Sequence, residues 1–173
     1  LIATDWYYDS ITRAYQLMKR YQPAGQPEKK LVIAQTNISS GYSLSPYEQD
    51  TFFASLWWTS VVAQSARTGK LSSLIWFKAA DDGLYNKGLV SLGSSSYTRK
   101  PASDAMRFVS RHLGTASALT SESSHPEVDA VGTLNSQGLL QVLGVNKGEH
   151  RQQITLSLPR SVRSITVSTL DEA

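Results

Sequence analysis

Cysteine is absent from this chain of 173 residues, and histidine is rare. Without cysteine the protein cannot form a disulfide bond or a thiolate metal site. The three histidines, His112, His125 and His150, lie far apart in the sequence and lack the spacing of metal ligands. We therefore expect no catalytic metal and no other cofactor.

Long apolar runs and clusters of basic residues are also missing. No stretch approaches the roughly 18 apolar residues that a membrane-spanning helix needs, and no signal peptide is recognisable. The net charge of +3 comes from lysines and arginines that are spread along the chain rather than gathered in a run. These absences argue against a membrane span and against a nucleic-acid partner.

The hydrophobic content of 40% is ordinary for a globular protein with a buried core. In the first part of the chain the pattern predicts helices that alternate with short apolar strands. We expect helices at 1–21, 45–68 and 100–113, and strands at 31–34 and 71–77. Strands with helices on both sides indicate a parallel sheet covered on both faces, and two strands cannot complete such a sheet alone.

The middle helix has two distinctive features. Ser45 and Glu48, with Pro46 between them, form a capping box that predicts where the helix begins. Its apolar residues, among them Trp57 and Trp58, cover a wide arc of the helix surface. We expect a helix of this kind to lie between other elements rather than on the surface.

A different pattern begins after Gly114. A linker rich in serine and threonine leads to four runs of strand length, separated by turn residues, at 128–134, 139–145, 153–158 and 164–170. Ile154, Leu156 and Leu158 alternate with polar residues, as in an antiparallel sheet with one solvated face. We therefore expect an α/β domain at 1–114 and an incomplete all-β domain at 115–173.

The two ends of the sequence lead to a further interpretation. The chain begins with Leu1 in a predicted helix and ends directly after a strand-like run. We interpret it as a fragment of a longer polypeptide. The strands that the sheet needs then belong to the N-terminal half of the same protein, which is either a separate, nicked chain or missing from this polypeptide.

The most informative stretch is the apolar run at 31–34, which ends abruptly in Gln35, Thr36 and Asn37. In α/β barrels the chemistry takes place at the carboxyl ends of the strands. Gln35 is therefore the first candidate for a functional residue. An amide at a strand end can also simply fix a loop by hydrogen bonding, and the residues alone leave both interpretations open.

Several segments together resemble the C-terminal part of a clan A retaining glycoside hydrolase. The matching segments are 32–37 for barrel strand seven, 74–77 with Asp81 or Asp82 for strand eight, 87–90 and 100–106 before and into the last barrel helix, and 143–147 for a sandwich strand. The β-xylosidase and α-L-iduronidase type is the most similar, with heparanase-like β-glucuronidases close behind. The resemblance implies the C-terminal portion of a (β/α)8 TIM barrel followed by an antiparallel β-sandwich.

The resemblance also implies a reaction, the retaining hydrolysis of a β-linked oligo- or polysaccharide. Such enzymes use two carboxylates roughly 5 to 5.5 Å apart. The acid/base would lie on strand four, outside this chain, and the position of the nucleophile is Gln35. A neutral amide cannot form the covalent glycosyl intermediate. Gln35 is then either an engineered replacement of glutamate or a natural loss of the nucleophile.

Two groups of further substrate-binding candidates follow from the resemblance. Trp76 would form an apolar floor for a sugar ring, although a core tryptophan is an equal alternative. Asn37 and Tyr42 follow Gln35 on the same loop and are expected to line the cleft. Tyr42 is the stronger of the two, because a phenol beside the nucleophile can tune its charge by hydrogen bonding.

Charged residues after the second strand form the other group. Asp82 is a candidate to bind sugar hydroxyls, although Asp81, Asp82 and Gly83 are also ordinary turn residues. Lys78 is a candidate to meet the carboxylate of a uronic acid, and so is Lys87. Most isolated lysines are simply solvated.

These inferences combine into one expectation, a secreted or periplasmic glycosidase. The main alternative is a non-catalytic carbohydrate-binding or scaffolding protein on the same fold, and Gln35 itself is the argument for it. A more distant alternative is an unrelated α/β enzyme with an appended sheet. Fold analogy alone does not establish the substrate.

Overall fold

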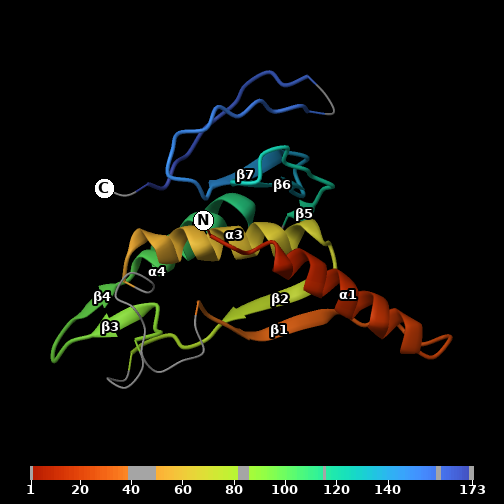
Figure 1. Ribbon diagram of the computed structural model, residues 1–173, viewed down its shortest axis with the longest axis horizontal. Coiled ribbons are helices and arrows are strands. Elements are labelled where there is room, and N and C mark those ends of the chain that lie inside the picture. Colours follow the sequence, from red (N-terminus) through yellow and green to blue (C-terminus); the bar gives the residue numbers. More distant parts are fainter. Residues whose placement is uncertain (1, 39–49, 82–85, 115, 159–160, 172–173) are drawn as a thin grey trace.

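The computed structural model describes residues 2–38, 50–81, 86–114, 116–158 and 161–171. The elements are, in chain order, α1 (Trp6–Tyr21), β1 (Leu31–Thr36), α3 (Phe52–Arg67), β2 (Leu71–Trp76), β3 (Val90–Leu92), β4 (Tyr97–Arg99), α4 (Pro101–Leu113), β5 (Ser117–Ala118), β6 (Val128–Leu134) and β7 (Leu140–Asn146). Figure 1 shows them in layers, with the helices between the β1–β2 sheet and the sheet of β5, β6 and β7. The protein is thus a mixed structure of helices and small sheets.

Strands β1 and β2 form a two-stranded parallel sheet, and α3 is the crossover helix that connects them. Leu31 pairs with Leu71, and Ile33 pairs with Leu74. These side chains pack toward the helices, so the apolar runs of the two strands are buried on one face. The predicted strands at 31–34 and 71–77 and their parallel arrangement are confirmed.

Helix α3 is the central element of the molecule. It contacts α1, α4, β2, β6 and β7, and Figure 1 shows it between the two sheets. Small buried residues such as Ala54, Ser60 and Ala63 allow these neighbours to approach closely. The prediction that the middle helix lies between other elements is confirmed. The helix begins at Phe52, and the predicted capping box at 45–48 lies outside the described residues.

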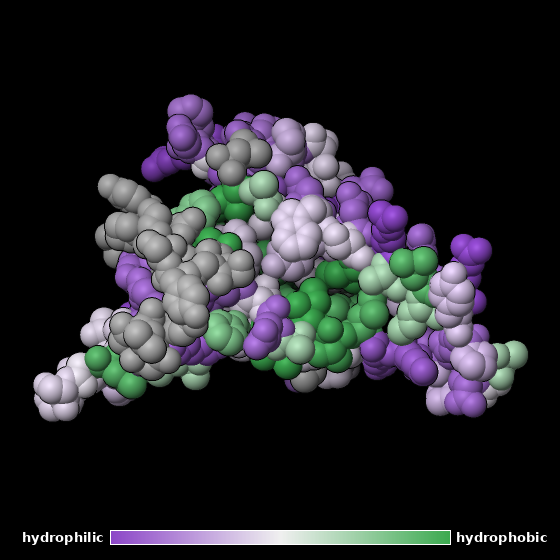
Figure 2. Space-filling model, turned by 60° about the horizontal axis from the view of Figure 1, so that its bottom comes forward, coloured by the Kyte–Doolittle hydropathy of each residue, from purple (hydrophilic) through white to green (hydrophobic). Residues whose placement is uncertain are grey.

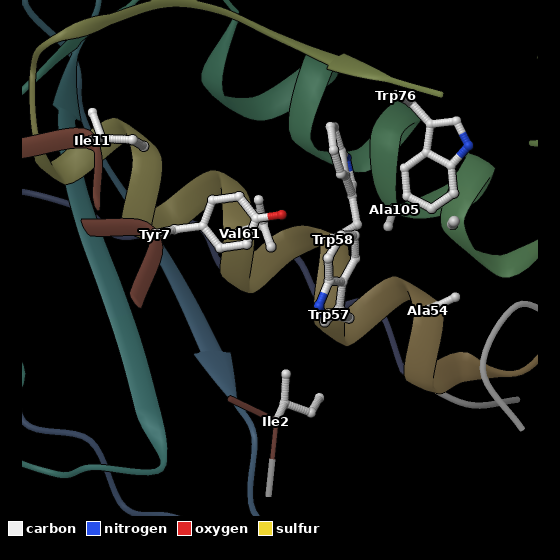
Figure 3. Close-up of a cluster of buried hydrophobic side chains, with 10 residues drawn as sticks. Ile2, Tyr7, Ile11, Ala54, Trp57, Trp58, Val61, Trp76 and Ala105 are labelled. Carbon is white, nitrogen blue, oxygen red and sulfur yellow. The ribbon is translucent and has the colours of Figure 1, made fainter. Parts of the chain in front are cut away.

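An aromatic cluster fills the space between α1, α3 and β2 (Figure 3). The ring of Tyr7 lies edge-on to Trp57, with centroids 6.3 Å apart, and Trp58 lies edge-on to Trp76 at 5.2 Å. Edge-to-face packing of this kind is the geometry that aromatic rings prefer, and each ring buries a large apolar area. The cluster therefore fixes the ends of the parallel strands against the helices.

The second sheet has the antiparallel order β5–β6–β7. Val131, Leu143 and Val145 on its inner face pack against Ala63 of α3, with side chains of α4 at the margin. Strands β6 and β7 confirm the predicted strands at 128–134 and 139–145. The turn between them contains Gly138 with a φ of 75°, a conformation that favours glycine. This sheet and helices α3 and α4 share one core.

The C-terminal region differs from the sequence prediction. The expected strands at 153–158 and 164–170 are not formed, because the described residues of this region pair with no neighbouring strand. Ile154, Ile165 and Val167 are exposed there. Alternating apolar residues form a strand only where a neighbour supplies hydrogen bonds and covers the apolar face. In contrast, β3 and β4 form a short hairpin between the predicted strand at 71–77 and the predicted helix at 100–113, where no strand was expected.

The described residues contain only part of the barrel-and-sandwich architecture that the resemblance implies. The described residues contain one parallel strand–helix–strand unit and two antiparallel sheets, the β3–β4 hairpin and β5–β6–β7, without a closed (β/α)8 barrel or a second sandwich layer. Within the same ranges, no helix has both the length and the apolar character to cross a membrane.

Candidate functional site

The site is built where β1 and β2 end, and an irregular register sets its geometry. Ile33 pairs with Leu74 and Thr36 pairs with Trp76, so two residues of β1 lie opposite the single residue Ile75 of β2. One extra residue in a strand changes the side to which the following side chains point. Ala34 and Gln35 are consequently both exposed, whereas Thr36 is buried. The irregularity thus turns Gln35 away from the core.

Thr36 anchors the strand end from the core side. The hydroxyl groups of Tyr7 and Thr36 are 2.7 Å apart and form a buried hydrogen bond. Burial raises the pKa of the Tyr7 phenol, and the hydrogen bond to Thr36 opposes part of this rise. The amide of Phe77 donates to the Thr36 carbonyl at 2.9 Å. The backbone that carries Gln35 is therefore held firmly on both sides.

Asn37 and Gln35 use their side-chain amides differently. The Asn37 Nδ2 atom donates to the carbonyls of Phe77 at 3.3 Å and Lys87 at 3.1 Å, and its Oδ1 atom accepts from the Ile38 amide. Asn37 therefore ties the strand end to the loop after β2. In the described part of the chain, no side-chain hydrogen bond holds Gln35, which projects from the exposed face. The loop-fixing interpretation suits Asn37 better than Gln35.

Trp76 lies at the end of β2 and belongs to the aromatic cluster. Its side chain is buried, its Nε1 atom donates to the Lys87 carbonyl at 3.0 Å, and its ring centroid lies 6.2 Å from that of Trp57. Figure 3 shows the indole beside Trp58 rather than projecting away from the core. This position corresponds to the core interpretation, one of the two that the sequence leaves open.

The remaining sequence candidates are distributed as follows. Lys78 follows β2, is half-buried and has a φ of 79°, an uncommon value for a residue with a side chain. Lys87 is buried and places its carbonyl between Asn37 and Trp76. Tyr42 and Asp82 lie outside the described residues. The structure thus brings Asn37 and Trp76 to one acceptor, and it places Gln35 on the opposite face of β1 from the buried Thr36.

A charged cluster beside this site was not predicted. Lys100, the residue before α4, is buried, and its Nζ atom lies 2.8 Å from Asp81 Oδ2 and 2.9 Å from Asp50 Oδ1. Its Nζ atom also donates to Asn86 Oδ1. Lysine is usually exposed, and these partners are distant in the sequence. The Lys100-Pro101 pair predicted the helix start but gave no sign of the cluster.

Opposing effects determine the ionisation of Asp81. Burial of its carboxyl group opposes the charged form and raises its pKa. The hydrogen bonds from Lys100 and the Gly88 amide, together with the positive charge of Lys100, outweigh burial and lower the pKa below its usual value. Asp81 is therefore a carboxylate that the surrounding donors stabilise, rather than a proton donor near neutral pH.

The acidic and histidine residues do not suggest a metal centre. Across the described ranges, no group of three or more histidine, cysteine, aspartate or glutamate residues is arranged to hold a metal ion. The nearest acidic pair, Asp50 and Asp81, is already bound to the ammonium group of Lys100. Among the described residues, the site offers hydrogen bonding by amides and the charge of lysine and aspartate.

The arrangement of strands, helix and polar residues indicates the general class of structure. Two parallel strands with a crossover helix and a polar site at their carboxyl ends are typical of α/β proteins. A search of protein-family models gave no match, and a search of curated proteins gave none either.

A solved structure provides the particular comparison. The chain is similar to the catalytic domain of GH30 xylanase C from Talaromyces cellulolyticus, with a TM-score of 0.53 and 18% sequence identity. The likeness covers 68% of this chain but only 28% of the xylanase chain, so the chain spans less than a third of that structure. At this identity the comparison shows a related fold alone. It agrees, at the level of fold, with the resemblance to glycoside hydrolases.

Proposed function

We propose that this chain is part of a carbohydrate-active protein of the glycoside hydrolase type, and that its sugar-facing residue at the end of β1 is Gln35. The observation that carries the proposal is the exposed amide of Gln35 at the carboxyl end of a parallel strand, which no side chain of the described residues binds. An amide both donates and accepts hydrogen bonds, which suits sugar hydroxyl groups. The fold similarity to a xylanase catalytic domain supports a β-linked oligo- or polysaccharide as the ligand.

The proposed protein has further parallel strands beside β1 and β2. Val32 and Ile75 project from the outer face of this sheet and are 54% and 45% exposed, and Figure 2 shows apolar side chains gathered on this side. Parallel sheets occur with both faces covered, because their strands are apolar on both sides. The additional strands would come from the N-terminal half of the same protein and would supply the acid/base carboxylate. A secreted or periplasmic location belongs to the same proposal.

The nature of residue 35 determines what the site can do. In a retaining mechanism a carboxylate attacks the anomeric carbon, and glutamine cannot take this role. With Gln35 the site is expected to bind sugar with little or no hydrolysis. A Gln35→Glu variant restores the carboxylate with almost the same shape and is expected to restore hydrolysis if the remaining catalytic groups are present.

The test is glycan binding and hydrolysis by the intact protein, together with any chain that copurifies with it. Xylan and xylo-oligosaccharides are the first probes, followed by other β-linked polysaccharides. Gln35→Ala should weaken binding roughly tenfold, the effect of losing hydrogen bonds to a bound ligand. Gln16→Ala, which changes an exposed glutamine on α1, is the matched control. Unchanged affinity in Gln35→Ala would overturn the assignment of the site.

A non-catalytic binding or scaffolding protein is the second candidate, and the neutral Gln35 favours it. The two candidates differ in the behaviour of Gln35→Glu. Hydrolysis of xylan or an aryl glycoside by this variant supports a glycosidase scaffold. Glycan binding without hydrolysis in the same variant supports the binding protein. Intact mass spectrometry of the purified material, performed first, establishes whether a second polypeptide accompanies the 19.0 kDa chain.

A further inference from the structure

A continuous series of polar contacts connects the start of α4 to the ends of β1 and β2. It begins at Lys100, whose side chain is only 4% exposed. The Nζ atom of Lys100 lies 2.8 Å from Asp81 Oδ2 and 2.9 Å from Asp50 Oδ1. An ammonium group at this depth is stable only with such partners, because burial of an unpaired charge is costly.

Asp81 connects Lys100 to the backbone of the loop after β2. Its Oδ1 atom accepts a hydrogen bond from the Gly88 amide at 2.7 Å, and its Oδ2 atom accepts from Ser91 Oγ at 3.0 Å. The backbone is tightly packed at this point, since a Cβ atom on Gly88 would lie 2.5 Å from the Ala80 carbonyl carbon. The conformation of the loop around Gly88 is thus closely defined.

The residue before Gly88 completes the connection. The Lys87 carbonyl accepts hydrogen bonds from the Trp76 indole at 3.0 Å and from the Asn37 amide at 3.1 Å. A single backbone oxygen therefore orients the last residue of β2 and a residue directly after β1. Any shift of this carbonyl changes both side chains together.

We propose that Lys100 is a positioning residue that acts through Asp81 to hold the Lys87 carbonyl, and thereby orients Trp76 and Asn37 at the ends of β2 and β1. The effect of this positioning on sugar binding rests on the proposed function. The positioning itself does not depend on it. Removal of the Lys100 charge leaves the carboxylates of Asp81 and Asp50 without their cation, so the loop is expected to rearrange.

The experiment follows the indole N–H signal of Trp76 by NMR in the ¹⁵N-labelled protein, with Trp76→Phe used to assign the signal among the four tryptophans. Lys100→Met should speed the hydrogen exchange of this indole roughly tenfold or more, because its hydrogen bond to Lys87 opens more often. Arg99→Met is the matched control, since the neighbouring Arg99 is half-exposed and forms its ion pair with the similarly exposed Asp104 at 3.5 Å.

A second variant covers the case in which Lys100→Met does not fold. Asp81→Asn keeps the shape and the Oδ1 acceptor for Gly88 but removes the charge that binds Lys100, and it should produce the same change in smaller degree. Unchanged Trp76 exchange in whichever of the two variants is folded would overturn the proposal. Faster exchange of all four indoles in equal measure would overturn it too, because it would indicate general loosening.

Glycan affinity is measured on the same samples and separates the two proposals. If the indole exchange changes and glycan affinity falls about tenfold in Lys100→Met, both are supported. If the exchange changes while the unmodified protein binds no glycan, the positioning role is supported and the proposed function fails. If Lys100→Met leaves the exchange unchanged while Gln35→Ala weakens binding, the function is supported and the positioning role fails.

Discussion

Two buried lysines perform different tasks in the same protein. Lys147, directly after β7, lies 3.0 Å from Asp129 and 3.4 Å from Asp5. Lys100, directly before α4, lies 2.8 Å from Asp81. Each ammonium group is nearly inaccessible to solvent, so burial alone does not distinguish the two.

Their partners distinguish them. Asp129 lies on β6 and also accepts hydrogen bonds from Gln64 and Ser60 of α3, so the Lys147 cluster joins the second sheet to the central helix. The partners of Lys100 lie in loops, and one of them holds the Gly88 amide. The same ionic chemistry thus fixes the packing of layers in one region and the shape of a loop in the other.

The largest expected effect is loss of the Lys147 charge. Lys147→Met should lower the free energy of unfolding by about 3 to 5 kcal/mol, because Asp129 is then left as a buried charge without a cation. Urea unfolding followed by circular dichroism measures the change. Lys29→Met, at an exposed lysine, serves as the control. A decrease of less than about 1 kcal/mol would contradict the role of Lys147 in joining the second sheet to the central helix.

Lys100→Met should have a smaller effect on the same measurement, about 2 kcal/mol. Its partner Asp50 is 47% exposed and regains water when the cation is removed, which reduces the cost. Equal destabilisation by Lys100→Met and Lys147→Met would contradict this distinction. The ion pairs of Lys100 with the loops would then contribute as much to stability as the ion pairs that join the second sheet to α3.

The pH dependence of stability sharpens the comparison at Asp81. Because the folded protein lowers the pKa of Asp81, this carboxylate contributes stability above its unfolded pKa of about 3.9, and the contribution is lost as the pH falls through the lower folded pKa. As the pH falls below about 4, the free energy of unfolding should therefore decrease less for Asp81→Asn than for the unmodified protein. Urea midpoints between pH 2.5 and 7 test this, and parallel curves for the two proteins would exclude the linkage.

The smallest effect is expected at the surface. Arg99 and Asp104 form an ion pair with both side chains nearly half-exposed. Arg99→Met should change the free energy of unfolding by no more than about 0.5 kcal/mol, since solvent screens such pairs. High salt should reduce even this difference. If Arg99→Met lowered the free energy of unfolding as much as Lys100→Met, burial would not explain the different contributions of the two ion pairs.

Local sequence signals predicted the regular elements well. The helix predicted at 100–113 is α4, which runs from Pro101 to Leu113. The apolar runs marked β1, β2, β6 and β7. Such signals depend on a few neighbouring residues, so one sequence is enough to detect them.

Features that depend on distant partners were harder to predict. The alternation at Ile154, Leu156 and Leu158 predicted a strand, but a strand also needs a neighbour, and the described residues provide none. Lys100 and Lys147 both pair with residues distant in the sequence, and lysine is usually exposed. For the site, the sequence drew attention to Gln35 and Asn37 at the strand end but did not reveal that, among the described residues, Asn37 binds the neighbouring loop while Gln35 points away from the core.

Because of the extra residue in β1, neighbouring positions of this strand have different structural constraints. Leu31 and Ile33 are constrained by the core, and Thr36 by its bond to Tyr7, whereas Gln35 between them faces outward and contacts none of these. Exchange between amide and carboxylate at position 35 therefore alters charge without altering packing. A mutation at position 35 is therefore expected to be nearly neutral for folding, so the charge at this strand end can change without a cost in stability.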